Sequence, residues 1–190
     1  VHSGAVSGFA PDTKNLLNDL ATFKPTFLLA VPRVFEKIYN SAEQNAGASG
    51  MLKIFRWAAK VAITHSRAQD TTAGPGLALK IAHRIADLLV YRKLRAALGG
   101  RTKWAVSGGA PLGERLGHFY RGIGLHVLEG YGRTETTAPT TVNTPTSTLI
   151  GTVGLPLPGT ALRVAEDGEL LIQGPHVFRG YHNDPDATKA

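Results

Sequence analysis

Two glycine-rich segments hold the residue types best suited to chemistry. The first reads Ser107-Gly108-Gly109-Ala110-Pro111-Leu112-Gly113 and follows a short apolar run. Paired glycines let a backbone come within contact distance of a flat ligand, and a proline suits the start of a helix. The same features serve ordinary packing, so this segment alone does not establish a site.

The second segment reads Glu129-Gly130-Tyr131-Gly132-Arg133-Thr134-Glu135. Tyr131 stands between two glycines, so its ring could cover the face of a purine. Thr134 offers a hydroxyl to a phosphate oxygen, and Glu135 offers a hard oxygen ligand to Mg²⁺. The alternative makes Tyr131 a half-buried aromatic residue and Glu135 a helix-capping partner.

A third segment, Gly168 to Tyr181, carries little chemistry by itself. Ala161–Val164 and Glu169–Gln173 alternate apolar and polar residues around Asp167-Gly168, a strong signal for a β-hairpin. We therefore expect a small antiparallel, barrel-like piece after residue 150.

The first two segments each follow a predicted strand. Thr102–Ser107 and Leu125–Leu128 suit strands, and Leu112–Arg121 between them suits a helix. Strand, helix, strand in this order predicts a βαβ unit with parallel strands. Open α/β sheets bind ligands beyond the carboxyl ends of their strands, so both segments are expected to face one crevice.

The first hundred residues read as mostly helical. We expect a helix over Asp12–Phe23, capped by Asp12, with Leu16, Leu17 and Leu20 on one face. The run Pro25–Val31 suits a buried parallel strand. Further helices are predicted over Arg33–Asn45, Met51–Gln69 and Leu77–Leu98, with a break at Gly47–Gly50 and a stop at Gly99-Gly100.

The helix predicted over Leu77–Leu98 carries an apolar stripe along one face. The stripe consists of five large aliphatic residues: Leu77, Ile81, Ile85, Leu88 and Leu89.

The composition suits a globular α/β chain. Of its 190 residues, 43% are hydrophobic and none is cysteine. The absence of cysteine excludes disulfides and thiolate metal sites, and it fits a cytoplasmic location. The net charge of +7 sits in residues 1–100, which hold 13 Lys and Arg against 6 Asp and Glu. These charges suit either an acidic partner such as membrane headgroups or solvated helix faces. They lack aromatic interleaving, so nucleic acid is not an expected partner. No transmembrane stretch or signal peptide is apparent.

Taken together, the order and spacing of the three segments resemble the adenylate-forming, AMP-binding superfamily. Ser107–Gly113 is similar to its SGGAPL loop, Gly130–Glu135 to its GYGxTE motif, and Gly168–Tyr181 to its GELxIxGxxVxxGY stretch. Val31–Tyr39 (VPRVFEKIY) and the helical insertion 51–98 resemble the long-chain fatty-acid–CoA ligase branch. The likeness covers essentially the whole chain.

This resemblance implies a two-step reaction. ATP and a fatty acid give an acyl adenylate and pyrophosphate, and the thiol of CoA then displaces AMP. By the same resemblance, Gly109, Ala110 and Pro111 line one side of the adenine, and Glu129 and Gly130 meet its exocyclic edge.

The remaining roles follow in the same way. Tyr131 stacks on the adenine ring, Thr134 contacts phosphate, and Glu135 holds Mg²⁺, so Thr134 and Glu135 are the expected catalytic residues. Gly108 and Gly109 border the acyl tunnel. Arg133 departs from the apolar residue that relatives carry at its position.

The resemblance also implies a division of the chain and an incomplete active site. Residues 1–149 would be the α/β part of the large N-terminal domain, with the insertion 51–98, and 150–190 the start of a β-barrel-like subdomain. The family's phosphate loop, ribose-binding aspartate and catalytic lysine are expected outside this internal piece, so the 190 residues alone should be inactive. An acyl-AMP ligase that loads a carrier protein, or an inactive binding module, remains an alternative.

Overall fold

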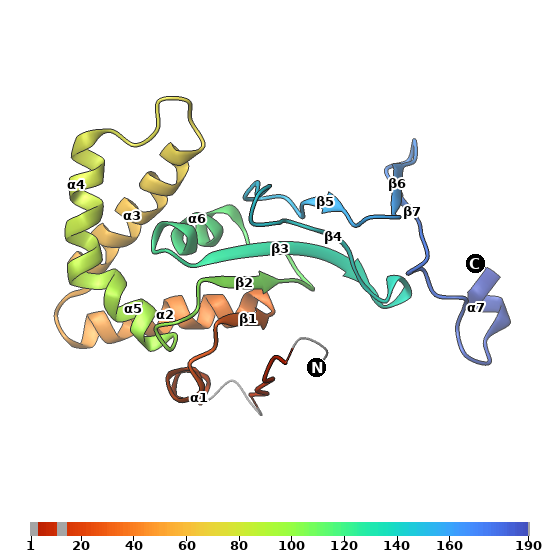
Figure 1. Cartoon of the computed structure of the whole chain (residues 1–190), viewed down its shortest axis with the longest axis horizontal. Helices are drawn as coiled ribbons and strands as arrows, with labels where there is room; N and C mark the ends of the chain where they lie inside the picture. Colours follow the sequence, from red (N-terminus) through yellow and green to blue (C-terminus); the bar gives the residue numbers. More distant parts are fainter. Residues whose placement is uncertain (1–3, 11–14, 190) are drawn as a thin grey trace.

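A computed structural model describes residues 4–10 and 15–189, which form a mixed α/β structure (Figure 1). Its helices are α1 Leu16–Phe23, α2 Pro32–Ala48, α3 Leu52–Gln69, α4 Leu77–Ala86, the π-helix η1 Asp87–Tyr91, α5 Arg92–Ala97, α6 Glu114–Gly122, the 3₁₀ turn η2 Thr134–Thr136 and α7 Pro185–Lys189. Its strands are β1 Phe27–Ala30, β2 Trp104–Ser107, β3 His126–Arg133, β4 Ala138–Val142, β5 Leu155–Pro156, β6 Ala161–Val164 and β7 Leu170–Gln173.

The first five strands form one sheet in the order β1-β2-β3-β4-β5. β1 is parallel to β2 and β2 is parallel to β3, while β4 and β5 add antiparallel strands beyond them. The predicted βαβ unit is therefore confirmed as β2, α6 and β3, and the α/β fold class with it.

β3 extends further than the sequence predicts. The predicted strand ends at Leu128, but β3 continues to Arg133 because it changes partner along its length. Its first half, from His126 to Glu129, pairs with β2, and its second half pairs with β4. The second glycine-rich segment is consequently mostly strand, where a loop past the strand end was expected.

β1 lies at the edge of the sheet, and only one of its faces is covered. Leu28 and Ala30 pack against the core, whereas Phe27 and Leu29 are exposed. The parallel pairing that we expected for Pro25–Val31 is confirmed, but its full burial is wrong, since helices cover one face of the sheet here.

The core lies between that face and the helices α2, α3 and α6. Phe35 of α2 is fully buried and meets Tyr120 of α6 edge to face, with ring centroids 5.4 Å apart. The Tyr120 hydroxyl donates a 2.6 Å hydrogen bond to the carbonyl oxygen of Phe35, so the polar atom of this buried ring is satisfied.

Small residues let α3 and α6 approach closely. A Cβ atom at Gly122 would overlap the backbone of Ala62, so a larger residue there would push the helices apart. A polar network crosses the same interface. Ser66 Oγ lies 3.0 Å from Nδ1 of His118 and accepts a 2.7 Å hydrogen bond from Arg121 Nε. Arg121 also pairs with Asp70.

α4, η1 and α5 follow one another where a single helix over Leu77–Leu98 was predicted. The π turn η1 adds one residue per turn within this helical run. The run ends as expected at Gly99, whose φ of +87° is left-handed, and Gly100 N donates to Arg95 O at 2.8 Å. α2 extends beyond its predicted end at Asn45, through Gly47 to Ala48. Only Ser49 and Gly50 of the predicted break lie outside the helix.

At the carboxyl end, β6 and β7 form a separate two-stranded sheet, which confirms the predicted hairpin around Asp167-Gly168. β5 lies beyond residue 150 yet pairs with β4 in the main sheet. The division at 149/150 remains a prediction. α1 presents Leu16 and Leu20 to the core as expected, while its predicted cap, Asp12, lies outside the described residues.

None of the helices in the described part of the chain is long and apolar enough to cross a membrane.

Candidate functional site

The two glycine-rich segments lie side by side where β2 ends and β3 changes partner. Ser107, the last residue of β2, pairs in register with Glu129, after which β3 continues beside β4. A Cβ atom added at Gly108 would lie 3.5 Å from the carbonyl oxygen of Gly130. The parallel pairing of β2 with β3 brings together residues more than twenty positions apart. A crevice that both segments face remains a prediction.

Glu129 connects these two segments directly. Its carboxylate oxygen Oε2 accepts a 2.9 Å hydrogen bond from the backbone N–H of Leu112, and its side chain is buried. Its backbone carbonyl accepts a 2.9 Å bond from Asn143 N. Glu129 therefore fixes the shape of the first segment, and its expected contact with adenine remains a prediction.

The turn of the first segment is open to solvent. Gly109, Ala110 and Pro111 are exposed, so a ligand could reach all three from outside. Gly109 has a left-handed φ of +85°, a conformation that favours glycine. A Cβ at that position would come within 3.8 Å of Val31, which places the start of the VPRVFEKIY segment beside this turn.

Tyr131 lies on β3 at a local irregularity of the sheet. It pairs with Thr141 of β4, and the register shifts between Tyr131 and Gly132. Gly132 has no room for a side chain, because a Cβ there would overlap the carbonyl of Ala138. The half-exposed Tyr131 ring thus stands on a strand held closely by β4, which gives it a fixed base.

β4 itself was not predicted. Thr and Val favour strands, and their frequency at 136–142 is the signal that could have found it. Thr140 and Thr141 are buried, and their hydroxyl oxygens have no hydrogen-bond partner among the described residues.

Thr134 and Glu135 begin the 3₁₀ turn η2 directly after β3. Thr134 is exposed. The carboxylate of Glu135 accepts a 2.7 Å hydrogen bond from the Tyr181 hydroxyl, and its other oxygen lies 3.5 Å from Arg133 Nε. The hydrogen bond from Tyr181 is the main cause that lowers the pKa of Glu135, so this carboxylate is ionised at neutral pH.

The third segment docks onto this turn. Phe178 N donates a 2.7 Å hydrogen bond to the carbonyl of Glu135, and Thr137 Oγ1 donates a 2.8 Å bond to His176 O. Together with Tyr181, these contacts tie residues 176–181 to residues 135–137. All three segments are thereby part of one continuous surface, a role for the third that its own residues did not indicate.

Asn143 is a further residue that the sequence did not single out. It is buried, its Nδ2 donates a 2.6 Å hydrogen bond to Thr152 O, and its Oδ1 accepts a 3.0 Å bond from Leu149 N. Through its bond to Glu129, it joins the end of β4 to the site and to the loop before β5.

A Mg²⁺ ion would find one carboxylate here. The described residues contain no cluster of three or more side chains that could hold a metal ion. Mg²⁺ is commonly held by one or two carboxylates together with substrate phosphates and water. An ionised Glu135 beside the exposed Thr134 fits that kind of shared site.

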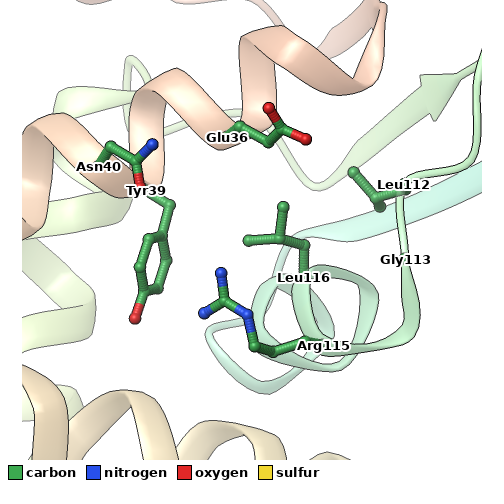
Figure 2. Close-up of a pocket in the computed structure, with 7 residues that line it drawn as sticks. All are labelled: Glu36, Tyr39, Asn40, Leu112, Gly113, Arg115 and Leu116. Atoms are coloured by element: carbon green, nitrogen blue, oxygen red, sulfur yellow. The ribbon is translucent and has the colours of Figure 1, made fainter.

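A cavity with a volume of about 330 Å³ lies behind the first segment, between α2 and α6. Figure 2 shows Glu36, Tyr39 and Asn40 of α2 opposite Arg115 and Leu116 of α6, with Leu112 and Gly113 at one side. None of the nine predicted site residues lines it, so the candidate site is the open surface at the strand ends.

Three comparisons place this geometry among known proteins. Residues 1–182 match the family described as "AMP-binding enzyme". The chain is 56% identical over 187 residues to the long-chain-fatty-acid–CoA ligase FadD15 of Mycobacterium bovis, covering 98% of this chain and 31% of that protein. It is 34% identical to long chain acyl-CoA synthetase 3 of Arabidopsis thaliana, covering all of this chain and 30% of that protein.

Among solved structures, the chain resembles a malonyl-CoA ligase with methylmalonyl-CoA and AMP bound. The TM-score is 0.55 at 26% identity, and the match covers 94% of this chain and 30% of that one. The chain thus spans about a third of the length of the proteins it matches.

Proposed function

The chain belongs to the AMP-binding enzyme family, and from this premise we propose that it is an internal segment of a ligase that activates long-chain fatty acids. The complete ligase forms acyl-AMP from ATP and a fatty acid and transfers the acyl group to CoA. The observation that carries this proposal is the meeting of Gly108–Pro111, Glu129–Glu135 and His176–Tyr181 on one surface at the ends of parallel strands.

The adenine is bound between the first two segments. Gly109, Ala110 and Pro111 offer an exposed, left-handed backbone turn to one side of the base, and Tyr131 offers its ring to the other. Glu129 holds the turn in place through Leu112, so the binding surface is preformed. Preformed contacts lower the entropic cost of positioning the reactants.

The triphosphate then extends toward η2. Thr134 donates its hydroxyl to a phosphate oxygen, and Glu135 supplies a carboxylate for Mg²⁺. When bound, Mg²⁺ would neutralise the charge that develops on the phosphates as the acyl adenylate forms. To bind Mg²⁺, the Glu135 carboxylate gives up its contact with Arg133. The hydrogen bond from the Tyr181 hydroxyl keeps the carboxylate oriented during this exchange.

We propose CoA as the acceptor because two relatives matched over nearly all of this chain are named a CoA ligase and an acyl-CoA synthetase. The helices α3, α4 and α5 also occupy the insertion 51–98 by which the sequence resembles that branch. The rival, transfer to a carrier protein, keeps the same first step. An inactive binding module is disfavoured by the presence of Tyr131, Thr134 and Glu135. A cytoplasmic location is part of this proposal.

The test uses the full-length ligase, purified and supplied with Mg²⁺, ATP and palmitate. We expect palmitate-dependent ATP–pyrophosphate exchange, followed by palmitoyl-CoA when CoA is added. Exchange with transfer only to a phosphopantetheinyl carrier protein would establish the rival acceptor. Absence of exchange with every fatty acid, in a protein that binds ATP and melts cooperatively, would overturn the proposal.

A further inference from the structure

α4 and η1 carry a row of large aliphatic side chains on their outer surface. Leu77, Ile81, Ile85, Leu88 and Leu89, the outer stripe, are between 46% and 76% exposed. At 1.5 Å per residue, the stripe runs about 18 Å along the helix. Apolar stripes of this kind normally face a core, and contiguous exposed ones mark interaction sites.

The helix is anchored by its opposite face. Leu79, Ala82 and Val90 pack against the core, and Ala86 and Tyr91 are fully buried in it. The Tyr91 hydroxyl donates a 2.7 Å hydrogen bond to the carbonyl of Ala58 in α3. The outer stripe is therefore not needed to hold α4 to α3, and Figure 1 shows α4 at the end of the molecule away from β6 and β7.

Positive charge is concentrated in residues 51–98, the segment that holds α3, α4, η1 and α5. It has nine Lys and Arg against two Asp and Glu, a difference that equals the whole net charge of +7. Two of these cations, Lys80 and Arg84, are exposed on α4, each three residues after a member of the stripe. Neither forms an ion pair with a carboxylate among the described residues.

We propose that the outer stripe, with Lys80 and Arg84 beside it, lies on the surface of a lipid bilayer that contains anionic headgroups. Aliphatic side chains next to Lys and Arg are the composition of helices that lie in a membrane interface. Long basic side chains keep their charge at headgroup level while their stems follow the apolar face.

Charge decides against the other occupants. A second copy would bring the same sevenfold positive segment against itself, which opposes association. A nucleic acid would be met by Leu and Ile, without the aromatic side chains on which bases stack. An anionic bilayer satisfies both the apolar row and the cations. Binding to the bilayer does not depend on catalysis. The benefit of that binding would be access to fatty acids dissolved in the bilayer, and this benefit rests on the proposed function.

The test measures flotation of the full-length ligase with vesicles of phosphatidylcholine, with and without phosphatidylglycerol, in the absence of substrates. We expect binding to the anionic vesicles that weakens as salt is raised. Lys80→Gln with Arg84→Gln should lower the partition coefficient about twenty-five-fold, since each cation at an anionic surface contributes about fivefold. Ile81→Gln with Ile85→Gln should lower it at least tenfold.

Matched control variants make the same changes of charge and polarity at positions outside the stripe. Arg101→Gln with Lys103→Gln removes two exposed cations near β2, and Leu149→Gln with Val164→Gln polarises two exposed aliphatic residues elsewhere. Both controls should bind vesicles like the unchanged ligase. Equal losses in test and control pairs would overturn the proposal, as would failure of the unchanged ligase to bind.

Labelling separates a covered stripe from a free one. These 190 residues contain no cysteine, so Ile81→Cys introduces the only thiol of this segment. In the full-length ligase this thiol should add to the maleimide labelling of the unchanged protein in solution, and anionic vesicles should protect it. A thiol that is unreactive without vesicles means that another part of the ligase covers the stripe, and a stripe variant that turns a dimer into monomers means that a second copy does. Either result overturns membrane docking, while palmitoyl-CoA formation with detergent-dispersed palmitate shows independently whether the proposed function holds.

Discussion

Among single residues, Tyr131 and Glu135 have the most distinct expected roles. Tyr131 stands on a strand that β4 holds in place, and Glu135 begins the turn that follows. A ring that stacks on adenine acts in both the ground state and the transition state, whereas a metal ligand acts most strongly when charge develops. Their substitutions should therefore affect different kinetic constants.

Tyr131→Ala in the full-length ligase should mainly raise KM for ATP. The expected loss is about 1–3 kcal/mol, the range measured for stacking of a base on an aromatic ring. Tyr131→Phe keeps the ring and should keep KM near its original value. Steady-state kinetics with ATP varied check both, and an unchanged KM in the alanine variant would contradict stacking.

Glu135→Ala should lower kcat by on the order of a hundredfold or more, because the lost metal contact matters most in the transition state. Glu166→Ala removes another exposed carboxylate, on the β6–β7 turn, and should leave kcat unchanged. Single-turnover adenylation at saturating ATP and Mg²⁺ measures the effect.

A second control separates the metal role of Glu135 from its structural contact. Tyr181→Phe removes the hydroxyl that donates to the carboxylate but leaves the carboxylate itself. We expect this variant to retain most of kcat. If Tyr181→Phe lost as much kcat as Glu135→Ala, the docking of the third segment would explain both, and the metal assignment would be wrong.

At the scale of elements, the α3–α6 interface holds the helical layer together. Gly122→Ala should lower the stability of the protein by about 1–3 kcal/mol or more, because the added methyl group would overlap the backbone of Ala62. Gly47→Ala in α2 is the matched change, since open space surrounds that position, and it should stabilise by up to about 1 kcal/mol. Urea unfolding of both variants measures the difference.

The same interface should make stability depend on pH. Burial is the first cause that lowers the pKa of His118, and Arg121 and Arg67 add to it, against opposite effects of Asp70 and Glu114. The unfolded chain takes up a proton near pH 6.5, but the folded one resists until lower pH. The stability that neutral His118 contributes is therefore present above about pH 6.5 and is lost as pH falls toward the folded pKa.

His118→Gln tests this pH dependence. Its amide oxygen could still accept a hydrogen bond from Ser66, so the variant should fold and show a smaller fall in melting temperature between neutral and mildly acidic pH. Part of the fall should remain, since burial also lowers the pKa values of His65 and His126. An equal slope in the His118→Gln variant and in the unchanged protein would contradict the assignment.

At the scale of the whole molecule, the full-length ligase should prefer long acyl chains. Each buried methylene contributes roughly 0.8 kcal/mol, so kcat/KM for palmitate should exceed that for acetate by orders of magnitude. The VPRVFEKIY segment, by which the sequence resembles the long-chain branch, supports the scaffold, because Phe35, Ile38 and Tyr39 pack into the core. Similar efficiencies for acetate, benzoate and palmitate would contradict the preference.

The sequence by itself determined the elements whose signals are local. Alternating residues around Asp167-Gly168 predicted the β6–β7 hairpin, and Gly99-Gly100 predicted where α5 ends. The order strand, helix, strand predicted parallel pairing of β2 with β3, and so the meeting of the two glycine-rich segments. These features depend on turn chemistry and periodicity within a few residues, which is why they can be predicted from the sequence.

Only the tertiary structure decided which partner each of these elements takes. The change of β3 from β2 to β4, the hydrogen bond from Tyr181 to Glu135, and the link from Glu129 to Leu112 join residues 5 to 46 positions apart. The outward direction of the aliphatic stripe was decided in the same way. One face of α4 carries the large aliphatic side chains, and the other carries Ala82 and Ala86. Because small side chains allow a closer approach to α3, the helix packs by its alanine face and the large side chains lie outside.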